Sequence, residues 1–469
     1  MPDAPITLIK GDKIGIETDY RDNLPVNMYA VEKDILGASG YMTDFPGLTS
    51  FASVNGFDRG GVYNDNQAEH YRVSGDKMVS VSRTGAVTNL GTIIGSEQAA
   101  MPYSFNTQAV IATGNMFLYD STNGFRQVLD SDLGSPIDCV WVDGYYFLTD
   151  GEYIYHTDLT DESAIDPLKY ATAEFMPDKS LGVAKTQDNK VIVFGRYSIE
   201  YFVNVATGNF AFERVETRAQ KIGIVATHAK CEAGTSFYFV GGRKNEAISV
   251  FAMGVGQSEK VSTREIDKVL AQYSEPQLSD IRMETLEFFG TRFVLIHLPN
   301  EVLCLNDTIL RSLGINHAWT ILKSDAKGDI KYRGINSVFD SRSGKWILGD
   351  KNSAVLGYLD ETTPDQYDML TEWVLYTPLF KLEGASLNQI EIETIPGHTT
   401  VSDATVAFSV TYDGLTYSRE FWQQYGSIND YNQRFILNRL GAVRDWAGIK
   451  IRGVSHSRMS FALMNINYG

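Results

Sequence analysis

Cysteine is scarce in this chain. Its three cysteines, Cys139, Cys231 and Cys304, lie far apart, are odd in number and form no CxxC or Cys/His ligand spacing. This distribution indicates neither a disulfide framework nor a zinc site. A reducing site of synthesis fits the cysteine content best.

Long apolar runs are missing as well. No stretch approaches the roughly 18 residues that a membrane-spanning helix needs. The first residues, MPDAPITLIKGDK, contain no basic region followed by an apolar run, so we expect no signal peptide. We therefore expect no membrane insertion by this chain.

Positive charge is in short supply. The chain has 41 Lys and Arg against 58 Asp and Glu, a formal net charge of −17. Gripping nucleic acid through its phosphates requires clusters of Lys and Arg, so the charge balance argues against that function. We interpret the densest group of basic residues as a solvated face, or as an interface with an acidic neighbour, in preference to a nucleic-acid-binding patch. It consists of Arg434, Arg439, Arg444, Lys450, Arg452 and Arg458, with Phe435, Trp446 and Phe461 among them.

Catalytic motifs are also absent. The sequence contains no GxSxG, HExxH or GxxxxGK[ST] motif, and no two of its seven histidines have metal-ligand spacing. His297 lies in an apolar run, where a buried histidine with satisfied hydrogen bonds is expected. Asp143, Asp150 and Asp340 could line the cleft of a propeller glycosidase, but nothing distinguishes them from acids in turns. We predict no catalytic residue, no metal ligand and no cofactor site.

Aromatic residues and glycine are abundant instead. The 25 Tyr and 24 Phe favour strands, and the 41 Gly supply turns. Runs of β-branched and aromatic residues, broken by Gly, Asn, Asp or Pro, predict hairpins. About seven such units occur, at 71–81, 108–120, 139–158, 191–204, 236–254, 292–307 and 336–360.

The spacing of these hairpins predicts the fold. The onsets at Val191, Phe237, Phe293 and Val338 are 46, 56 and 45 residues apart, near the ~40–50 residues of one propeller blade. We predict an all-β protein with a β-propeller of about six or seven blades. A pair of unrelated β-sandwiches is the alternative. Helix is expected only within Ser262–Phe289, ending at Pro276.

The pattern changes after Tyr358–Leu370, where the expected strands become longer. We predict an additional C-terminal β-sandwich-like domain at 366–469, after a propeller at 56–365 and an extended segment at 1–55. "SVTYDGLTYS" (Ser409–Ser418) resembles the Asp-box turn of sialidase-type propellers. It occurs once, lacks the closing Trp, and in those proteins is a structural turn.

The segment Asp19–Phe51 combines turn residues with many apolar side chains and keeps neither the helical nor the strand period. A long ordered loop is uncommon and usually functional. We predict that this segment packs against another domain or subunit, with Tyr41, Phe45 and Phe51 as anchors. The alternative is that it covers the protein's own core. The predicted interface residues are Tyr20, Leu24, Pro25, Asn27, Tyr41, Phe45, Pro46 and Phe51.

This segment resembles the N-terminal signature of the packaged-DNA stabilisation proteins of short-tailed, needle-bearing bacteriophages. The resemblance rests on Tyr20, on "NLPVNM" (23–28), and on Gly40, Tyr41 and "FPG" (45–47). Further similar blocks follow in order along nearly the whole chain. They are "DLTDESAIDPLKYATAE" (158–174), "SIEYF" (198–202), "METLEFFGTRFVLIHLP" (283–299), "YRG" (332–334), "GDKNSAVLG" (349–357) and "YTPLFKLEGA" (376–385).

The resemblance implies a virion protein of the tail without catalytic activity, assembled in the host cytoplasm. Such tail accessory factors form the hub, or nozzle, as a hexameric ring below the portal. The implied partners are the portal adaptor (head-to-tail connector) above, the tail needle below and the tailspikes at the side. The ring retains packaged DNA in the head, and at infection double-stranded DNA leaves through its bore without sequence-specific binding.

The acidic composition agrees with such a conduit, because negative walls repel phosphates and let DNA slide. The alternative function is a tail-associated carbohydrate-active propeller, either a glycosidase or a glycan-binding protein.

Overall fold

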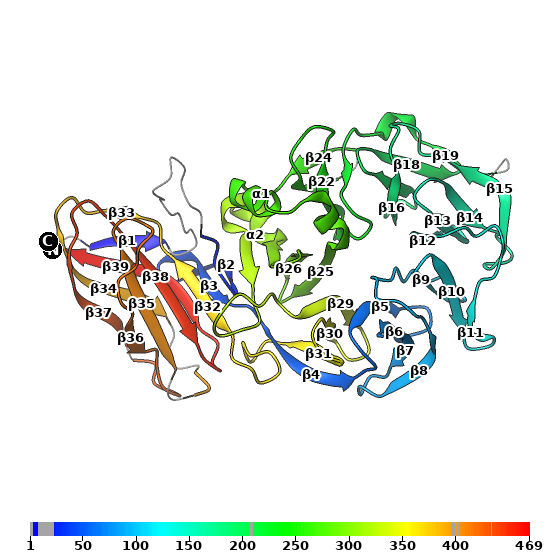
Figure 1. Cartoon of the computed structure of the whole chain (residues 1–469). Coiled ribbons are helices and arrows are strands. Elements are labelled where there is room, and N and C mark those ends of the chain that lie inside the picture. The colour runs from blue at the N-terminus through cyan, green and yellow to red at the C-terminus, as the bar shows by residue number, and fades with distance from the viewer. Residues whose placement is uncertain are drawn as a thin grey trace.

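The computed structural model describes residues 3–7, 23–206, 210–254, 256–394, 399–401, 404–432 and 434–469. Figure 1 shows a ring of small β-sheets and, beside it, a pair of longer sheets packed face to face. The predicted all-β fold, a β-propeller with an additional C-terminal β-sandwich, is confirmed, and the alternative of two unrelated sandwiches is wrong.

In the described residues the ring contains seven antiparallel sheets, here called blades 1 to 7 in chain order, within the predicted six or seven. Blade 1 contains β5 (Asp58–Asn64), β6 (Glu69–Ser74), β7 (Lys77–Val81) and β8 (Val87–Thr92). Blade 2 contains β9 (Gln108–Ala112), β10 (Asn115–Asp120) and β11 (Gly124–Gln127). Blade 3 contains β12 (Asp138–Val142), β13 (Tyr145–Thr149), β14 (Ile154–Thr157) and β15 (Ile165–Ala171).

The remaining blades complete the ring. Blade 4 contains β16 (Ser180–Lys185), β17 (Val191–Gly195), β18 (Ile199–Asn204) and β19 (Phe212–Arg214). Blade 5 contains β20 (Gly223–Ile224), β21 (Lys230–Ala233), β22 (Ser236–Gly242), β23 (Ser249–Met253) and β24 (Ser258–Lys260). Blade 6 contains β25 (Arg282–Phe288), β26 (Thr291–His297), β27 (Val302–Asn306) and β28 (Trp319–Leu322). Blade 7 contains β29 (Gly334–Asp340), β30 (Lys345–Asp350), β31 (Val355–Asp360) and β4 (Gly47–Ser53).

Short turns set the hairpins of the blades. Between β9 and β10 the central residues Thr113 and Gly114 have φ angles of 52° and 69°. Between β12 and β13 Asp143 and Gly144 have φ angles of 49° and 94°. Two successive positive φ angles are typical of the type I′ turn, whose twist matches that of paired strands. Asp143, considered above as a possible cleft carboxylate, is therefore a turn residue.

Apolar clusters join each blade to the next. Val73 of blade 1 and Phe117 of blade 2 belong to one cluster, and Leu118 of blade 2 and Tyr146 of blade 3 belong to the next. Burial of such side chains contributes about 25 cal/mol for each Å² of apolar surface removed from water. The ring is therefore stabilised mainly by sheet-on-sheet packing around its circumference.

The ring closes through a strand from near the N-terminus. β4 pairs antiparallel with β31, with Leu48 opposite Leu359 and Gly47 opposite Asp360. Blade 7 thus combines one strand from the beginning of the propeller sequence with three from its end. The main-chain groups of β31 are satisfied by this pairing instead of forming an open sheet edge.

A buried arginine joins the first blade to the last. The side chain of Arg72 in β6 is 0% exposed and donates to Asp58 Oδ2 at 2.8 Å. It also donates to the main-chain oxygens of Asn336 (2.9 Å) and Ile347 (2.7 Å) in blade 7. Because a buried charge is costly unless paired and hydrogen-bonded, these contacts fix the position of blade 1 against blade 7.

The sandwich consists of two sheets and includes N-terminal strands. One sheet has the order β2-β3-β39-β34-β37, with β1 also paired to β39, and the other has the order β32-β38-β35-β36, with β33 paired to β38. The strands of the first are β1 (Asp3–Thr7), β2 (Met28–Ile35), β3 (Ala38–Asp44), β34 (Ser386–Thr394), β37 (Phe435–Ala442) and β39 (Ser460–Tyr468). Those of the second are β32 (Glu372–Tyr376), β33 (Phe380–Lys381), β35 (Thr405–Thr411), β36 (Phe421–Gln424) and β38 (Trp446–Val454).

The predicted extended segment at 1–55 is therefore divided between the two domains. β1, β2 and β3 complete a sheet of the sandwich, and β4 completes blade 7. Met28 and Met42 of the β2–β3 hairpin share a core cluster with Phe408 and Phe461 of the sandwich. Their burial accounts for the apolar residues that fit neither period in the sequence.

Helices are short and lie beside blades 5 and 6 (Figure 1). The predicted helix is present as α1 (Arg264–Leu270), which buries Ile266 and Leu270 and ends before Pro276. Pro276 is the second residue of a separate 3₁₀ turn, η2 (Glu275–Asp280). The other helical elements are α2 (Asp307–Ser312), η1 (Glu216–Arg218) and η3 (Ile315–His317). Within the described ranges no helix has the length and hydropathy to span a bilayer.

Candidate functional site

The segment from Asn23 to Phe51 lies where propeller and sandwich meet. Val26 forms a β-bridge to Ile321 of blade 6 and a second to Val374 of the sandwich. Its N–H donates to Val374 O at 2.9 Å, and the N–H of Ile321 donates to Pro25 O at 2.9 Å. The segment therefore acts as an extra strand between the two domains.

Asn27 fixes this junction with its side chain. Nδ2 donates to the main-chain oxygens of Glu372 (2.7 Å) and Lys323 (3.2 Å), and Oδ1 accepts from the N–H of Lys323 at 2.8 Å. Its φ angle is 51°, a left-handed conformation that asparagine tolerates better than most residues. Both backbone geometry and hydrogen bonding therefore select asparagine here.

Phe45 anchors the same segment in the propeller. Its side chain is 4% exposed, and its ring makes edge-to-face contacts with Phe293 (5.5 Å between centroids), Phe288 (5.7 Å) and Tyr332 (6.0 Å). Such pairs add about 0.5–1.5 kcal/mol beyond area burial. After Phe45 the chain passes so close to the main-chain oxygen of Asp365 that a Cβ at Gly47 would overlap it.

The other predicted interface residues have contacts within the chain. Leu24 packs against the main core cluster, Pro46 is buried, Tyr41 is half-buried, and Phe51 stacks edge-on against Tyr358 at 6.4 Å. Tyr20 lies outside the described residues. These contacts lie within the chain, against both the propeller and the C-terminal domain, and an interface with another subunit through these residues stays a prediction.

Two ionic groups reinforce the junction. Arg458 donates to the main-chain oxygens of Glu361 (2.7 Å) and Asp44 (2.6 Å), and His456 contacts the Asp365 carboxylate at 2.5 Å. Asp44 accepts from the N–H of Met459 at 2.6 Å. Burial raises the pKa of Asp44 to about 7, against the lowering effect of that hydrogen bond and of Arg458.

The basic group found in the sequence does not form one patch. Arg458 belongs to the domain junction, Arg434 pairs with Glu391 on one sheet, and Arg452 pairs with Glu420 and Glu372 on the other. Phe435 and Phe461 are buried in the core. A continuous basic surface, which binding of nucleic-acid phosphates requires, is therefore not formed by these residues.

Polar side chains from different blades meet near the axis of the ring. Gln98, in the connection between blades 1 and 2, donates to Asn336 Oδ1 of blade 7 at 2.8 Å, and its main chain faces His228 of blade 5. Lys230 of blade 5 donates to Asp138 of blade 3 at 2.7 Å. Blades that are not neighbours in the ring therefore contact each other directly through side chains.

A buried triad joins blades 6 and 7. His297 contacts Glu284 at 2.7 Å and Lys351 at 2.8 Å, which confirms the expectation of a buried histidine with satisfied hydrogen bonds. Burial, then the nearby Lys351, lower the pKa of His297 to about 4. These groups are enclosed between sheets, so they stabilise packing and do not face a cleft.

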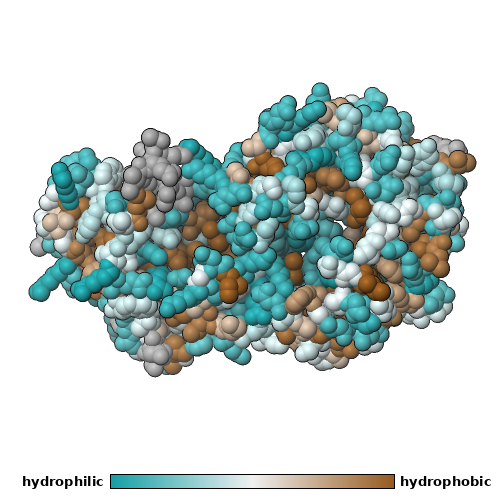
Figure 2. Space-filling view, viewed as in Figure 1, coloured by the Kyte–Doolittle hydropathy of each residue, from teal (hydrophilic) through white to brown (hydrophobic). Residues whose placement is uncertain are grey.

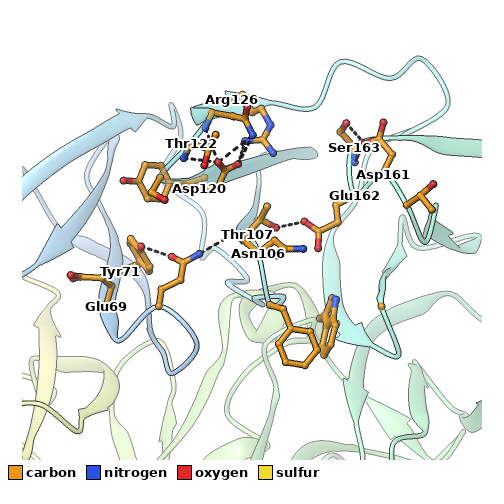
Figure 3. Close-up of a pocket in the computed structure, with 18 of the residues that line it drawn as sticks. Glu69, Tyr71, Asn106, Thr107, Asp120, Thr122, Arg126, Asp161, Glu162 and Ser163 are labelled. Atoms are coloured by element: carbon orange, nitrogen blue, oxygen red, sulfur yellow. Dashed lines mark hydrogen bonds and ion pairs between the residues drawn. The ribbon is translucent and has the colours of Figure 1, made fainter.

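A groove crosses blades 1 to 3 on one face of the propeller, with a volume of ≈ 970 Å³. In Figure 3, Glu69 and Tyr71 come from blade 1, Asp120 and Arg126 from blade 2, and Glu162 from the turn before β15. The full lining is Gln67, Glu69, Tyr71, Ser80, Phe105, Asn106, Thr107, Tyr119, Asp120, Ser121, Thr122, Asn123, Arg126, Trp141, Gly144, Leu159, Thr160, Asp161, Glu162 and Ser163.

The carboxylates of this groove are held by turns. Asp120 accepts from the N–H groups of Thr122 (2.9 Å) and Asn123 (2.7 Å). These bonds and Arg126, acting against burial, lower the pKa of Asp120 to about 2. Bonds from Ser163 lower the pKa of Asp161. Two carboxyls of the lining are therefore firmly ionised, unlike the general acid of a glycosidase, whose pKa is raised.

The residues that the structure describes support neither a metal-binding site nor a reactive cysteine. They contain no group of three or more His, Cys, Asp and Glu arranged to hold a metal ion. Cys139 and Cys304 are buried, and burial raises the pKa of both thiols. Asp340 is fully buried and bonded to Arg342, and Asp150 accepts from the N–H groups of Glu152 and Tyr153. Both are therefore structural acids.

The exposed surface offers no large continuous apolar area in the view of Figure 2. Hydrophilic side chains cover most of it, and hydrophobic ones appear in separate patches, one beside the hollow at the centre of the ring. Sequence reasoning missed the groove, because its lining comes from turns of three blades. No local signal marked it, because Phe105 and Trp141, whose rings meet in space, lie far apart in the sequence.

Comparisons with known proteins cover the whole chain. Residues 4–364 match the family described as bacteriophage P22 Gp10, β-propeller, and residues 372–469 match bacteriophage P22 Gp10, β-sandwich. The chain is 32% identical over 486 residues to "Tail hub protein gp10" of Salmonella phage P22, covering 98% of each protein.

Solved structures resemble the chain more distantly. The N-terminal domain of Nup159 is 11% identical with a TM-score of 0.43, over 72% of this chain and 99% of that one. The extracellular domain of BT4673 from B. thetaiotaomicron is 10% identical with a TM-score of 0.39, over 68% of this chain and 40% of that one.

Proposed function

The chain belongs to the P22 Gp10 family of phage tail hub proteins, and we propose that it forms the hub below the portal that retains packaged DNA and conducts it at ejection. The observation that carries this proposal is the match of both domains, in order, to a tail hub protein over 98% of each chain. The match directly supports a structural role in the phage tail.

The proposed DNA channel lies between several copies of the chain and not inside one propeller. Lys230 of blade 5 hydrogen-bonds to Asp138 of blade 3, two blades that are not neighbours in the ring. Blades that are within hydrogen-bonding distance of each other in this way leave no space for a DNA duplex between them. This supports a closed ring of copies, which we propose to be a hexamer, with DNA in its common bore.

The charge of the chain supports passage without binding. A net charge of −17 repels phosphates, and the basic side chains Arg434 and Arg452 are paired with carboxylates. The proposed partners are therefore held by protein contacts: the portal adaptor above, the tail needle below and tailspikes at the side. DNA passes without sequence-specific contacts.

The extensive junction between propeller and sandwich supports a role in holding the partners of the hub in a fixed arrangement. The domains are connected by the chain after Asp44, by the chain after Asp360, and by the bridges of Val26 to both. Inter-domain contacts that are this extensive restrict hinge motion. A hub that sits between a head and a needle requires a fixed geometry of this kind.

Complementation in vitro tests the proposal. DNA-filled heads that lack their hub are incubated with purified chain, and released DNA is measured by its sensitivity to nuclease. We expect added chain to protect the DNA, and negative-stain microscopy to show rings at the portal vertex. Heads that leak equally with and without the chain, or isolated chain that hydrolyses a surface polysaccharide, would contradict it.

A further inference from the structure

We propose that the groove over blades 1 to 3 binds an uncharged saccharide chain, a function separate from the hub role and independent of it. The groove joins the exposed ring of Phe105 and the half-buried ring of Trp141 to a bed of short polar side chains. Its volume of ≈ 970 Å³ lies near the upper end of the range for small-ligand sites, about 300–1,000 Å³.

The aromatic wall is formed by Phe105 and Trp141. Phe105 is 69% exposed, and its ring stands edge-on to the indole of Trp141, at 5.0 Å between centroids and 84° between planes. Lys185 lies 5.3 Å from the indole centroid, which holds that ring in place. An exposed aromatic ring such as that of Phe105, at a concave site, favours the apolar C–H face of a sugar ring, as it favours other apolar surfaces.

The polar wall suits hydroxyl groups. Amides and hydroxyls both donate and accept hydrogen bonds, as sugar hydroxyls do, and the lining contains such groups at Gln67, Asn106, Asn123, Ser121 and Thr160.

Most of this wall is already ordered. The side chain of Gln67 donates to Asn106 O at 3.1 Å, Ser104 caps the turn at Asn106 and Thr107, and Thr107 donates to Glu162 at 2.6 Å. A site fixed in this way loses little entropy on binding.

The charges in the groove select against other ligand classes. The lining contains four acids, Glu69, Asp120, Asp161 and Glu162, and one basic residue, Arg126. This balance repels phosphates, so single-stranded nucleic acid, which needs a positive groove beside its stacking platforms, is disfavoured.

A basic peptide fits less well than a sugar because the acids already have partners. Glu69 accepts from Arg342 (3.0 Å), Asp120 from Arg126 (2.6 Å), Glu162 from Thr107 (2.6 Å) and Asp161 from Ser163 (2.6 Å). Little carboxylate charge remains to pair with lysine or arginine. A neutral ligand with many hydroxyl groups satisfies the remaining lone pairs without adding a buried charge.

The test uses the purified full chain on an array of bacterial surface polysaccharide fragments, followed by calorimetric titration of the best neutral fragment. We expect binding, and at least a tenfold weaker affinity for Phe105→Ala and Asn106→Ala. Both side chains are exposed, so the variants should keep the melting temperature of the parent. The matched control is Phe289→Ala, which removes a ring that is 76% exposed on blade 6 and should leave binding unchanged.

Three results would overturn the saccharide site: no neutral fragment binds, Phe105→Ala binds as tightly as the parent, or an oligolysine peptide or oligo(dT) binds in the groove and no glycan does. Phe105→Ala is also tested in the head-complementation assay, where we expect full DNA protection. That readout separates failure of the saccharide site from failure of the hub proposal.

Discussion

The side chain of Asn27 donates a 2.7 Å hydrogen bond to the main-chain oxygen of Glu372, 345 residues further along the chain. This bond connects the N-terminal strand segment to the first strand of the second sandwich sheet. The same side chain exchanges two hydrogen bonds with the main chain of Lys323 at the end of blade 6. A single residue therefore touches both domains at their junction.

Asn27→Gly should lower the free energy of unfolding by about 1–3 kcal/mol, because buried main-chain groups lose their partners. Glycine accepts the positive φ, so backbone strain does not contribute. Urea denaturation measures the change. The control, Asn245→Gly, has φ of 69° at an exposed turn and should be near neutral. Equal effects of the two substitutions would show that the Asn27 bonds are unimportant.

Arg72→Met should destabilise the propeller by about 3–5 kcal/mol, because it leaves the buried Asp58 carboxylate without its partner. Burial already raises the pKa of Asp58, and removal of Arg72 should raise it further. The double variant Arg72→Met with Asp58→Asn should recover part of the loss. Arg126→Met is the control, since its pair with Asp120 is partly solvent-exposed and should cost less than about 1 kcal/mol. A small loss in Arg72→Met would argue against a lock between blades 1 and 7.

The fragment 366–469 should fail to fold alone, because it lacks β1 and β3, which pair with one edge of β39, and β2, which helps to close the core. Joining residues 1–44 to it through a flexible linker should restore a cooperative thermal transition. Circular dichroism and amide NMR dispersion distinguish the two fragments. A cooperative transition in 366–469 without the hairpin would contradict the shared-sheet architecture.

Asp44→Asn should change how stability depends on pH. The folded-state pKa of Asp44 is about 7, above its unfolded value of about 4, so the folded state binds more protons between those values. The stability contributed by the protonated carboxyl is therefore present below about pH 4 and is lost as pH rises to 7. The variant should show a weaker fall in unfolding free energy between pH 4 and 7, and should exceed the parent above pH 7. Asp329→Asn, at an exposed pair with Lys323, should not weaken that fall. An unchanged pH profile for Asp44→Asn would refute the assignment.

Local patterns predicted most of the propeller. The hairpin at 191–204 became β17 and β18, and that at 292–307 became β26 and β27, because alternation and turn residues act over a few positions. Blade 2 was harder to predict, since its inner side is completed only by isolated bridges of Ala100 and Tyr103 to Ile111 and Gln108 of β9. The sequence there has Pro102 and no strand-length run.

The domain junction could not be predicted from local pattern. Phe45 and Met42 are equally apolar in sequence, yet Phe45 packs in the propeller and Met42 in the sandwich. The choice is made by partners such as Phe293 and Phe461, which lie hundreds of residues away. The groove escaped prediction for the same reason, because it depends on how the turns of three separate blades approach one another.

The pairing of β4 with β31 has a consequence for the order of events during synthesis. Gly47 leaves the ribosome 313 residues before its partner Asp360, a delay of roughly 15–60 s at 5–20 residues per second. During that time blades 1 to 6 can form by local pairing, while β4 still lacks its partner strand. The β2–β3 hairpin lacks its partner for longer, because β39 is the last strand to be translated. β31 therefore completes the propeller first, and the last residues translated, those of β39, complete the sandwich. A chain truncated before β39 would expose unpaired strands of the sandwich. Nascent hubs should be recognised by chaperones up to the moment of release, and only full-length chains should become competent to join a particle.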